Sequence, residues 1–229
     1  MRNFWTYISN ERYSVGCTGQ TVYLYDRDGK ELAKFKDLIY AYNAVFSPDG
    51  KIFVVKSTDG RLAVYAPETA SLIRKFRFSK INCSQDDGFC FSPDGKYFIN
   101  IERQQDECRS AISFYDAGDF SLAHRMSMDR KISLNCIEYD PASATYYVLG
   151  YKRGSIRNDH FVAVLKDFSL QDPIRLSDAE HEFYRGYKDL ELHGFTEKAY
   201  AWSHGIDLPL EKLRLSGHSL AKIYTYYHH

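Results

Sequence analysis

The chain has 229 residues, 44% hydrophobic and 26% charged, which is the composition of a globular protein able to bury a core. Thirty basic residues balance thirty acidic ones, so no overall field draws the protein to nucleic acid or to an anionic membrane. The 19 Tyr and 15 Phe residues favour a strand-rich fold, because aromatic side chains suit pleated, half-buried surfaces.

The N-terminal segment 1–14, MRNFWTYISNERYS, lacks the apolar core and the small residues of a signal peptide. No apolar run approaches the ~20 residues that a membrane-spanning helix needs. We therefore expect a cytoplasmic protein without a membrane segment. The five cysteines are scattered and show no paired C-x-x-C spacing; they are Cys17, Cys83, Cys90, Cys108 and Cys136. We therefore expect reduced thiols, and we expect the protein to bind no metal or other cofactor.

A repeated pattern runs along the chain after a first expected strand at 3–9. The sequence FSPDGK at 46–51 recurs at 91–96, and YDPA at 139–142 is a weaker copy. Internal repeats of this length indicate solenoids or propellers. In each unit, runs of β-forming residues predict a second and a third strand: 13–17 and 22–25, 52–55 and 62–65, 97–101 and 112–115, 146–149 and 162–165, and 199–202 and 213–215.

A leucine opens the expected fourth strand of every unit, with spacings of 40, 50, 48 and 50 residues. Such regular spacing indicates one structural role for all of them. We expect Leu72 and Leu122 to be buried where neighbouring units pack. The five leucines are Leu32, Leu72, Leu122, Leu170 and Leu220.

The turns agree with this reading. In Ser-Pro-Asp-Gly, proline presets φ and glycine accepts a positive φ, so Gly50 and Gly95 are predicted to lie at positive φ. Asp28-Gly29 predicts a tight turn between the third and fourth strands of the first unit. A four-stranded sheet cannot cover its own two faces, but sheets stacked radially share a core. The chain is therefore predicted to be all-β, a single domain 1–229 of about five four-stranded antiparallel blades, approximately 1–36, 37–79, 80–129, 130–177 and 178–229.

These features resemble the blades of WD-repeat β-propellers, through the FSPDGK turns, the third strands ending in Tyr-Asp at 25–26 and 115–116, and the Ser-Leu that follows. The resemblance covers nearly the whole chain and implies a β-propeller fold. The chain departs from the family at Tyr65-Ala66 and Leu165-Lys166, and the family's Gly-His dipeptide is missing ahead of the innermost strands. The hydrogen-bonded tetrad of the family is therefore not expected here.

The expected ring has fewer blades than the seven that the family more often uses. It begins with an innermost strand at 3–9 and ends with an outermost strand at 220–227, so the two termini exchange no strand. The ring can then be open or imperfectly closed, and self-association would follow if it is open.

Catalytic signatures are absent. The sequence contains no H-E-x-x-H, G-x-S-x-G, Walker or G-x-G-x-x-G motif. The residues 26–29 resemble a calcium loop less than a hairpin turn. We expect a non-enzymatic interaction module that binds a protein or peptide. The alternative that stays open is a small-ligand-binding or hydrolytic propeller with a site at the mouth of the central channel, to which His160, His181, His193 and His204 could contribute.

The resemblance places the loops between second and third strands, and those leading into the next blade, on one common face. Here these loops are the long polar ones, at 80–88, 103–109, 152–160 and 177–187. The last begins with a capping box, Ser177 and Glu180, which predicts a short helix. Function concentrates on such loops above a rigid scaffold. The expected partner-binding residues of this loop-rich face are Asp86, Asp87, Arg103, Arg109, Lys152, Arg153, Arg157, Tyr184, Arg185 and Tyr187.

Two plainer readings of these residues stay open. The aromatic residues near Arg185 can equally hold the predicted helix against its blade. The basic cluster can equally be a solvated loop that Asp106, Glu107 and Asp159 neutralise. Nucleic acid is not the expected partner, because the chain has no net charge.

Overall fold

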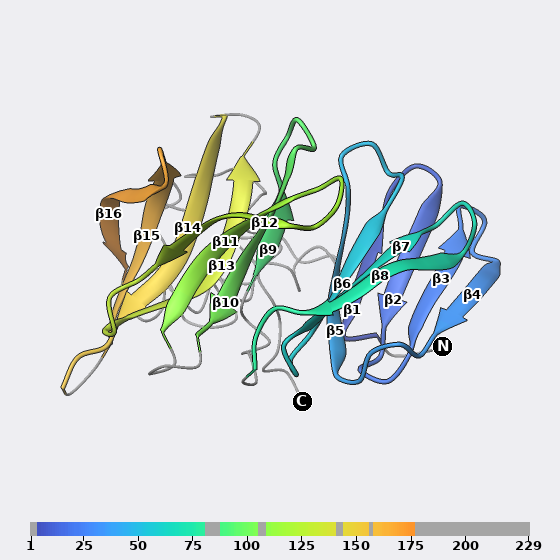
Figure 1. The fold of residues 1–229 in the computed structure, drawn as a ribbon, viewed down its shortest axis with the longest axis horizontal. Helices are drawn as coiled ribbons and strands as arrows, with labels where there is room; N and C mark the ends of the chain where they lie inside the picture. The colour runs from blue at the N-terminus through green and yellow to red at the C-terminus, as the bar shows by residue number, and fades with distance from the viewer. Residues whose placement is uncertain (1–3, 81–87, 105–108, 141–143, 156–157, 177–229) are drawn as a thin grey trace, which may run out of the picture.

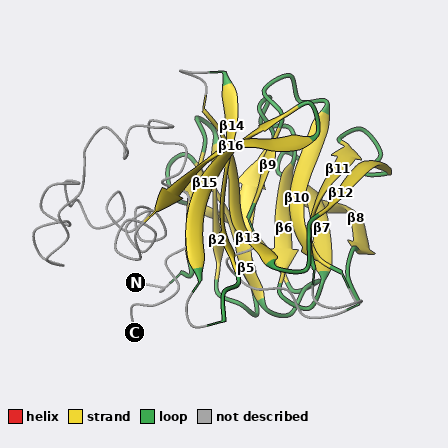
Figure 2. Ribbon diagram, turned by 90° about the vertical axis from the view of Figure 1, so that its left-hand side faces the viewer, coloured by secondary structure: helices red, strands yellow, loops and turns green. Residues whose placement is uncertain are grey.

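The computed structural model describes residues 4–80, 88–104, 109–140, 144–155 and 158–176. Within these residues the chain is all-β, as predicted, and has no helix (Figures 1 and 2). This part of the chain accordingly holds no helix of the length and apolarity that crossing a membrane requires. The predicted fifth blade, 178–229, and the predicted helix at 177–187 lie outside the described residues.

The strands form four antiparallel sheets, in each of which consecutive strands pair in chain order. We call the sheets blades 1 to 4, counted from the N-terminus. Blade 1 contains β1 (Thr6–Ser9), β2 (Tyr13–Cys17), β3 (Val22–Asp26) and β4 (Glu31–Phe35), and blade 2 contains β5 (Ala41–Phe46), β6 (Phe53–Ser57), β7 (Arg61–Ala66) and β8 (Ser71–Arg77). Blade 3 contains β9 (Phe89–Phe91), β10 (Tyr97–Arg103), β11 (Ser110–Asp116) and β12 (Leu122–Ser127), and blade 4 contains β13 (Ile132–Asp140), β14 (Thr145–Lys152), β15 (Asp159–Lys166) and β16 (Ser169–Leu176).

The blades lie side by side in chain order, as Figure 1 shows. The first strand of each blade is the innermost one: β1 contacts β5, β5 contacts β9, and β9 contacts β13. An isolated bridge between Gly19 and Ala41 also joins blade 1 to blade 2. Within the described residues, no strand of blade 4 pairs with a strand of blade 1, so these four blades do not close a ring.

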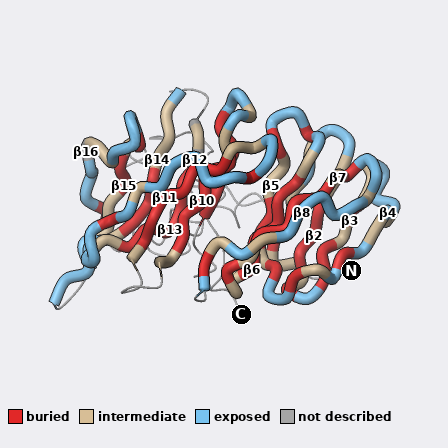
Figure 3. The backbone as a smooth tube through the Cα atoms, viewed as in Figure 1, coloured by how far each residue is buried: buried red, intermediate tan, exposed pale blue. Residues whose placement is uncertain are grey.

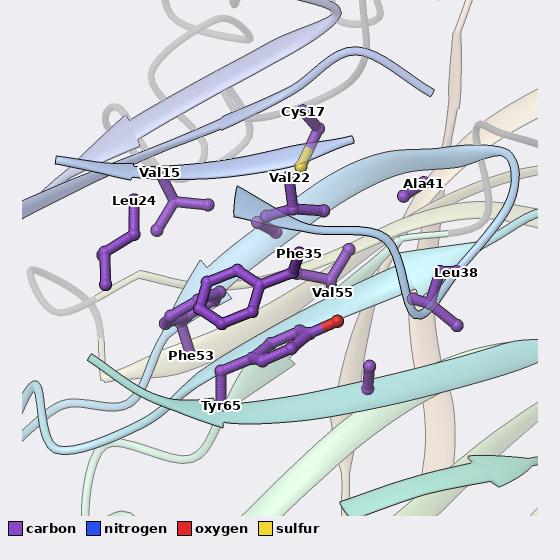
Figure 4. Close-up of a cluster of buried hydrophobic side chains, with 12 residues drawn as sticks. Val15, Cys17, Val22, Leu24, Phe35, Leu38, Ala41, Phe53, Val55 and Tyr65 are labelled. Carbon is purple, nitrogen blue, oxygen red and sulfur yellow. The ribbon is translucent and has the colours of Figure 1, made fainter. Parts of the chain in front are cut away.

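Buried residues lie mainly along the inner strands of the blades (Figure 3), and buried side chains of consecutive blades form shared clusters. Fully burying one large apolar side chain contributes about 1.5–3 kcal/mol, so these interfaces hold the array together. Figure 4 shows the core between blades 1 and 2, which includes Val15, Leu24, Phe35, Phe53 and Tyr65. The cores of the next two interfaces include Val54, Leu62, Phe89, Phe98 and Tyr115 for blades 2 and 3, and Ile99, Ile112, Leu134, Ile137 and Val148 for blades 3 and 4.

One aromatic contact repeats between blades. Phe35, at the end of the outer strand of blade 1, packs on Tyr65 in the third strand of blade 2, with ring centroids 4.4 Å apart. At the next interface Phe76 packs in the same way on Tyr115, at 5.6 Å. Tyr65 and Tyr115, near the ends of the third strands of blades 2 and 3, are therefore contacts between blades.

The predicted burial of Leu72 and Leu122 is wrong. The side chains of Leu72 and Leu122 are 38% and 47% exposed, and Leu32 is also exposed. The fourth strand is the outermost in each blade, and β8 and β12 are exposed along most of their length. Leu170 is the exception, because it packs partly buried against the core between blades 3 and 4.

The Ser-Pro-Asp-Gly turns have the predicted geometry. Gly50 and Gly95 lie at φ of 67° and 71°. In the first turn, the Ser47 hydroxyl donates to the Asp49 carboxylate at 2.7 Å, and the Lys51 backbone N–H donates to the same carboxylate at 3.1 Å. These hydrogen bonds lower the pKa of Asp49 to about 2, because they stabilise its ionised form.

A buried polar network joins blades 2 and 3. Lys56, only 4% exposed, donates from Nζ to the Asn100 Oδ1 at 2.8 Å and to the Ile101 carbonyl at 2.6 Å. Asn100 Nδ2 in turn donates to Glu102 Oε1, at 3.2 Å. Glu102 also accepts from the Tyr115 hydroxyl at 2.5 Å and from Arg125 Nη2 at 2.8 Å. Buried polar groups are costly unless they are paired, so this network requires the two blades to meet in one register.

The outward face of blade 1 carries an aromatic layer instead of a neighbouring blade among the described residues. The ring of Phe4 lies against Tyr7, Tyr23 and Tyr25, with centroids 5.5, 5.9 and 6.2 Å away. Gly16 makes room for it, since a Cβ there would meet the Phe4 ring at 2.5 Å. Tyr7 remains 37% exposed.

The corrected leucine positions predict unequal costs for two substitutions in the same blade. Leu62→Ala should lower the free energy of unfolding by about 2–5 kcal/mol, because Leu62 is fully buried. Leu72→Ala should cost about 1 kcal/mol or less, since its side chain is already partly in water. Urea unfolding of the two variants measures both values. Equal, large losses would show that the outer strand is buried after all.

The turn geometry predicts a pH effect at Asp49. The pKa of Asp49 lies below its ordinary 3.8, so the carboxylate stabilises the fold above that pH, and its contribution is lost as the pH falls toward about 2. Ser47→Ala should raise this pKa, because the Ser47 hydrogen bond is the largest cause of the shift. An NMR titration of the Asp49 carboxyl carbon measures it. Ser92→Ala is the matched control: it should raise the pKa of Asp94 and leave Asp49 unchanged.

Candidate functional site

The connections at the loop-rich face differ less in length from the opposite turns than the sequence pattern predicts. The β8–β9 connection, 78–88, is clearly the longest. The β10–β11 connection, 104–109, is no longer than the 47–52 turn on the opposite face, and the β6–β7 connection, 58–60, is short. Loop length alone therefore does not identify this whole face as functional. The side chains at the strand ends on this face must be considered as well.

Two of the predicted partner-binding residues meet at one hydroxyl group. Arg103, at the end of β10 in blade 3, donates from Nη1 to Ser133 Oγ at 2.8 Å. Arg153, just after β14 in blade 4, donates from Nη2 to the same oxygen at 3.2 Å. Ser133 lies in β13 and is fully buried, while Arg153 is exposed. The fold thus brings two guanidinium groups from neighbouring blades together, which we call the arginine pair.

Backbone hydrogen bonds hold the arginine pair in place. The Ser79 hydroxyl donates to the Arg103 carbonyl at 2.8 Å, and Arg103 Nη2 reaches the Leu134 carbonyl at 3.5 Å. The Arg153 N–H donates to the Lys131 carbonyl at 2.7 Å. Both side chains therefore start from ordered backbone, which reduces the entropy that a bound partner would have to remove.

The chemistry of the arginine pair favours anions. Guanidinium groups stay charged in proteins and present planar sets of donors that match carboxylate and phosphate oxygens. Ser133 Oγ occupies one donor of Arg153, and no other side-chain hydrogen bond of Arg153 is made to a described residue. An acidic group approaching from the exposed side can use the remaining donors.

The other predicted site residues do not all join the arginine pair. Arg109 accepts a backbone hydrogen bond from Gln104 at 2.8 Å, which closes the base of the β10–β11 connection. Lys152 lines a separate cleft in blade 4. Six further residues lie outside the described residues: Asp86, Asp87, Arg157, Tyr184, Arg185 and Tyr187.

The innermost strands bury polar atoms of their own. Thr6 Oγ1 in β1, Asn43 Nδ2 in β5 and Asn135 Oδ1 in β13 are buried and have no hydrogen-bond partner among the described residues. Each such group costs about 1–3 kcal/mol unless water or a ligand satisfies it. The described side chains of β1, β5, β9 and β13 include no His, Asp or Glu.

The described residues show no group of three or more His, Cys, Asp or Glu side chains arranged to hold a metal ion. His160 packs edge-on against Tyr151, at 5.7 Å between ring centroids. The other histidines that could have converged with it, His181, His193 and His204, lie outside the described residues. The thiols of Cys17, Cys90 and Cys136 are buried and form no disulfide.

Sequence reasoning missed Ser133, which organises the arginine pair. Ser133 stands in ISLNC, an ordinary strand sequence with no turn or motif near it. Only the packing of β10 beside β13 makes its hydroxyl the common acceptor for two blades. The basic residues were the only feature of the sequence that pointed to this site. The sequence alone could not show which of them would lie close together.

Two solved structures show the fold. The chain is similar to hydrazine synthase of Kuenenia stuttgartiensis, with a TM-score of 0.59 and 15% identity, over 73% of this chain and 51% of that one. It is equally similar to the WD40 domain of Toxoplasma gondii coronin, with a TM-score of 0.59 and 16% identity, over 77% and 47%. The chain thus spans about half the length of these solved chains. It is a WD-like β-propeller, as the sequence resemblance implied.

No protein-family model matches the chain, and no curated protein matches its sequence.

Proposed function

We propose that the protein is a non-enzymatic interaction module that binds an acidic segment of a protein or peptide at the loop-rich face of blades 3 and 4. The observation that carries this proposal is the arginine pair at Ser133. Arg153 presents an exposed guanidinium to an anion, and Arg103, held at the same Ser133 hydroxyl, adds a second positive charge beside it.

The likeness to the coronin WD40 domain supports the fold on which this proposal rests, and the binding surface is inferred from the side chains of this chain. The predicted contributions of Asp86, Asp87, Arg157, Tyr184, Arg185 and Tyr187 belong to the same proposal. The proposed setting is the cytoplasm.

A binding experiment with matched peptides tests this function. Two fluorescein-labelled peptides are used, one alternating Glu and Gly and the other alternating Gln and Gly. The acidic peptide should bind in fluorescence anisotropy and lose affinity as salt is raised, because the contacts are between charges. Arg153→Ala should weaken it by about 1–2 kcal/mol, since it removes an exposed guanidinium that supports little of the fold.

Arg27→Ala is the matched control. Arg27 is an exposed arginine in the β3–β4 turn on the opposite face, so its loss should leave binding unchanged. Equal binding of the acidic and neutral peptides would refute the proposal, as would equal effects of the two arginine variants. Tyr184→Ala and Arg185→Ala in the same assay test the residues outside the described part of the chain.

A second function is favoured by the buried polar atoms of the inner strands. Thr6, Asn43 and Asn135 offer both donors and acceptors near the propeller centre, which suits water or a small polar ligand. This is the small-ligand alternative, and it needs no catalytic group.

The outward aromatic face of blade 1 is a candidate surface for self-association, which stays a prediction. If the ring stays open in the whole chain, the exposed Tyr7 and its neighbours should pair with a second copy. A mass measurement in solution decides it: a dimer that Tyr7→Lys dissociates supports self-association through this face, and a monomer at all concentrations rejects it.

A further inference from the structure

Blade 4 contains an apolar cleft that the proposed partner surface does not use. Its volume is about 440 Å³, within the range of pockets that hold small organic molecules. Strands β13, β15 and β16 each supply part of its apolar lining. The apolar lining residues are Ile132, Phe161, Ala163, Leu170 and Pro173.

The rim of this cleft is charged. Lys152 at the end of β14, Asp159 at the start of β15 and Arg175 in β16 all line it. Arg175 Nη2 is paired with Asp159 Oδ1 at 2.9 Å, so these two charges compensate each other. The ammonium group of Lys152 has no hydrogen bond or ion pair with any described residue, so the charged side chains among the described lining residues sum to one positive charge in excess.

The cleft is distinct from the arginine pair, although Lys152 and Arg153 are neighbours in sequence. Successive side chains of a strand point to opposite faces. Lys152 is opposite Ile132, whose side chain lines the cleft, whereas Arg153 reaches the hydroxyl of Ser133. The two positive groups thus serve two different surfaces.

From this geometry we infer that the cleft binds a small apolar organic anion, with its hydrocarbon body on Phe161, Ala163 and Leu170 and its acidic group at Lys152. The apolar lining accounts for the hydrocarbon body, which gains free energy by leaving water. The unpaired ammonium accounts for the charge, because an anion at the edge of an apolar surface is attracted more strongly than in bulk water. A cation would face the excess positive charge of the rim.

The probe for the experiment is 1-anilinonaphthalene-8-sulfonate, an aromatic anion whose fluorescence rises in apolar sites. Titration of the full chain should give one saturable site. 2-Naphthoate should displace the probe, whereas 2-naphthalenemethanol, which has a similar ring and no charge, should displace it at least fivefold less effectively. Lys152→Glu should weaken probe binding about five- to tenfold, and Lys152→Arg should retain it.

Two further variants separate this site from other apolar surfaces. Lys166→Glu makes the same charge change in the same blade but at the opposite end of β15, and it should leave the affinity unchanged. Ala163→Val adds two methyl groups at a buried position that lines the cleft and should weaken binding severalfold, while an unchanged circular-dichroism spectrum shows that the variant still folds. Wild-type affinity in both Lys152→Glu and Ala163→Val would overturn the proposal, as would equal displacement by the charged and uncharged naphthalenes.

Discussion

The contact between the outer strand of one blade and the third strand of the next is the interaction on which this structure depends. A four-stranded sheet has two faces, and neither can stay in water without cost. Phe35 on Tyr65 and Phe76 on Tyr115 cover the faces of successive blades with rings 4.4 and 5.6 Å apart. Aromatic pairs of this kind contribute beyond the area they bury. These contacts fix the position of each blade relative to the next. They therefore also fix the positions of the residues at the ends of the strands.

Blades 2 and 3 have an additional constraint, since they enclose the ammonium group of Lys56. Its partners Asn100 and Ile101 lie at adjacent positions of β10. A slip of one residue would turn every side chain of that strand to the other face and leave the buried charge against apolar groups. The polar network thus selects one register where two similar Ser-Pro-Asp-Gly blades meet. The same register places Arg103 at the end of β10, within reach of Ser133.

The parts of the fold that follow from local chemistry could be predicted from the sequence. Proline and glycine determine the conformation of the turns at Gly50 and Gly95, whatever surrounds them. Burial depends on neighbours that are distant in sequence, and the regular leucines were misjudged for that reason. Leu72 recurs at the same position of each unit but lies in an outer strand that is exposed along most of its length. The site was predictable only as a set of basic residues. Their division between the arginine pair and the cleft depends on the neighbours that the fold brings to each: Lys152 pairs with Ile132, and Arg153 reaches Ser133.

The position of Phe4 has a consequence for how such an array can end. In repeat proteins each unit needs a neighbour, so the first and last units require special end caps. Phe4 lies over Gly16 and against Tyr25, in the place where Phe35 and Phe76 of preceding blades cover Tyr65 and Tyr115. A single side chain outside the sheet thus supplies blade 1 with the aromatic partner that blades 2 and 3 receive from the preceding blade. The aromatic cover of Tyr25 therefore does not depend on a neighbouring blade among the described residues.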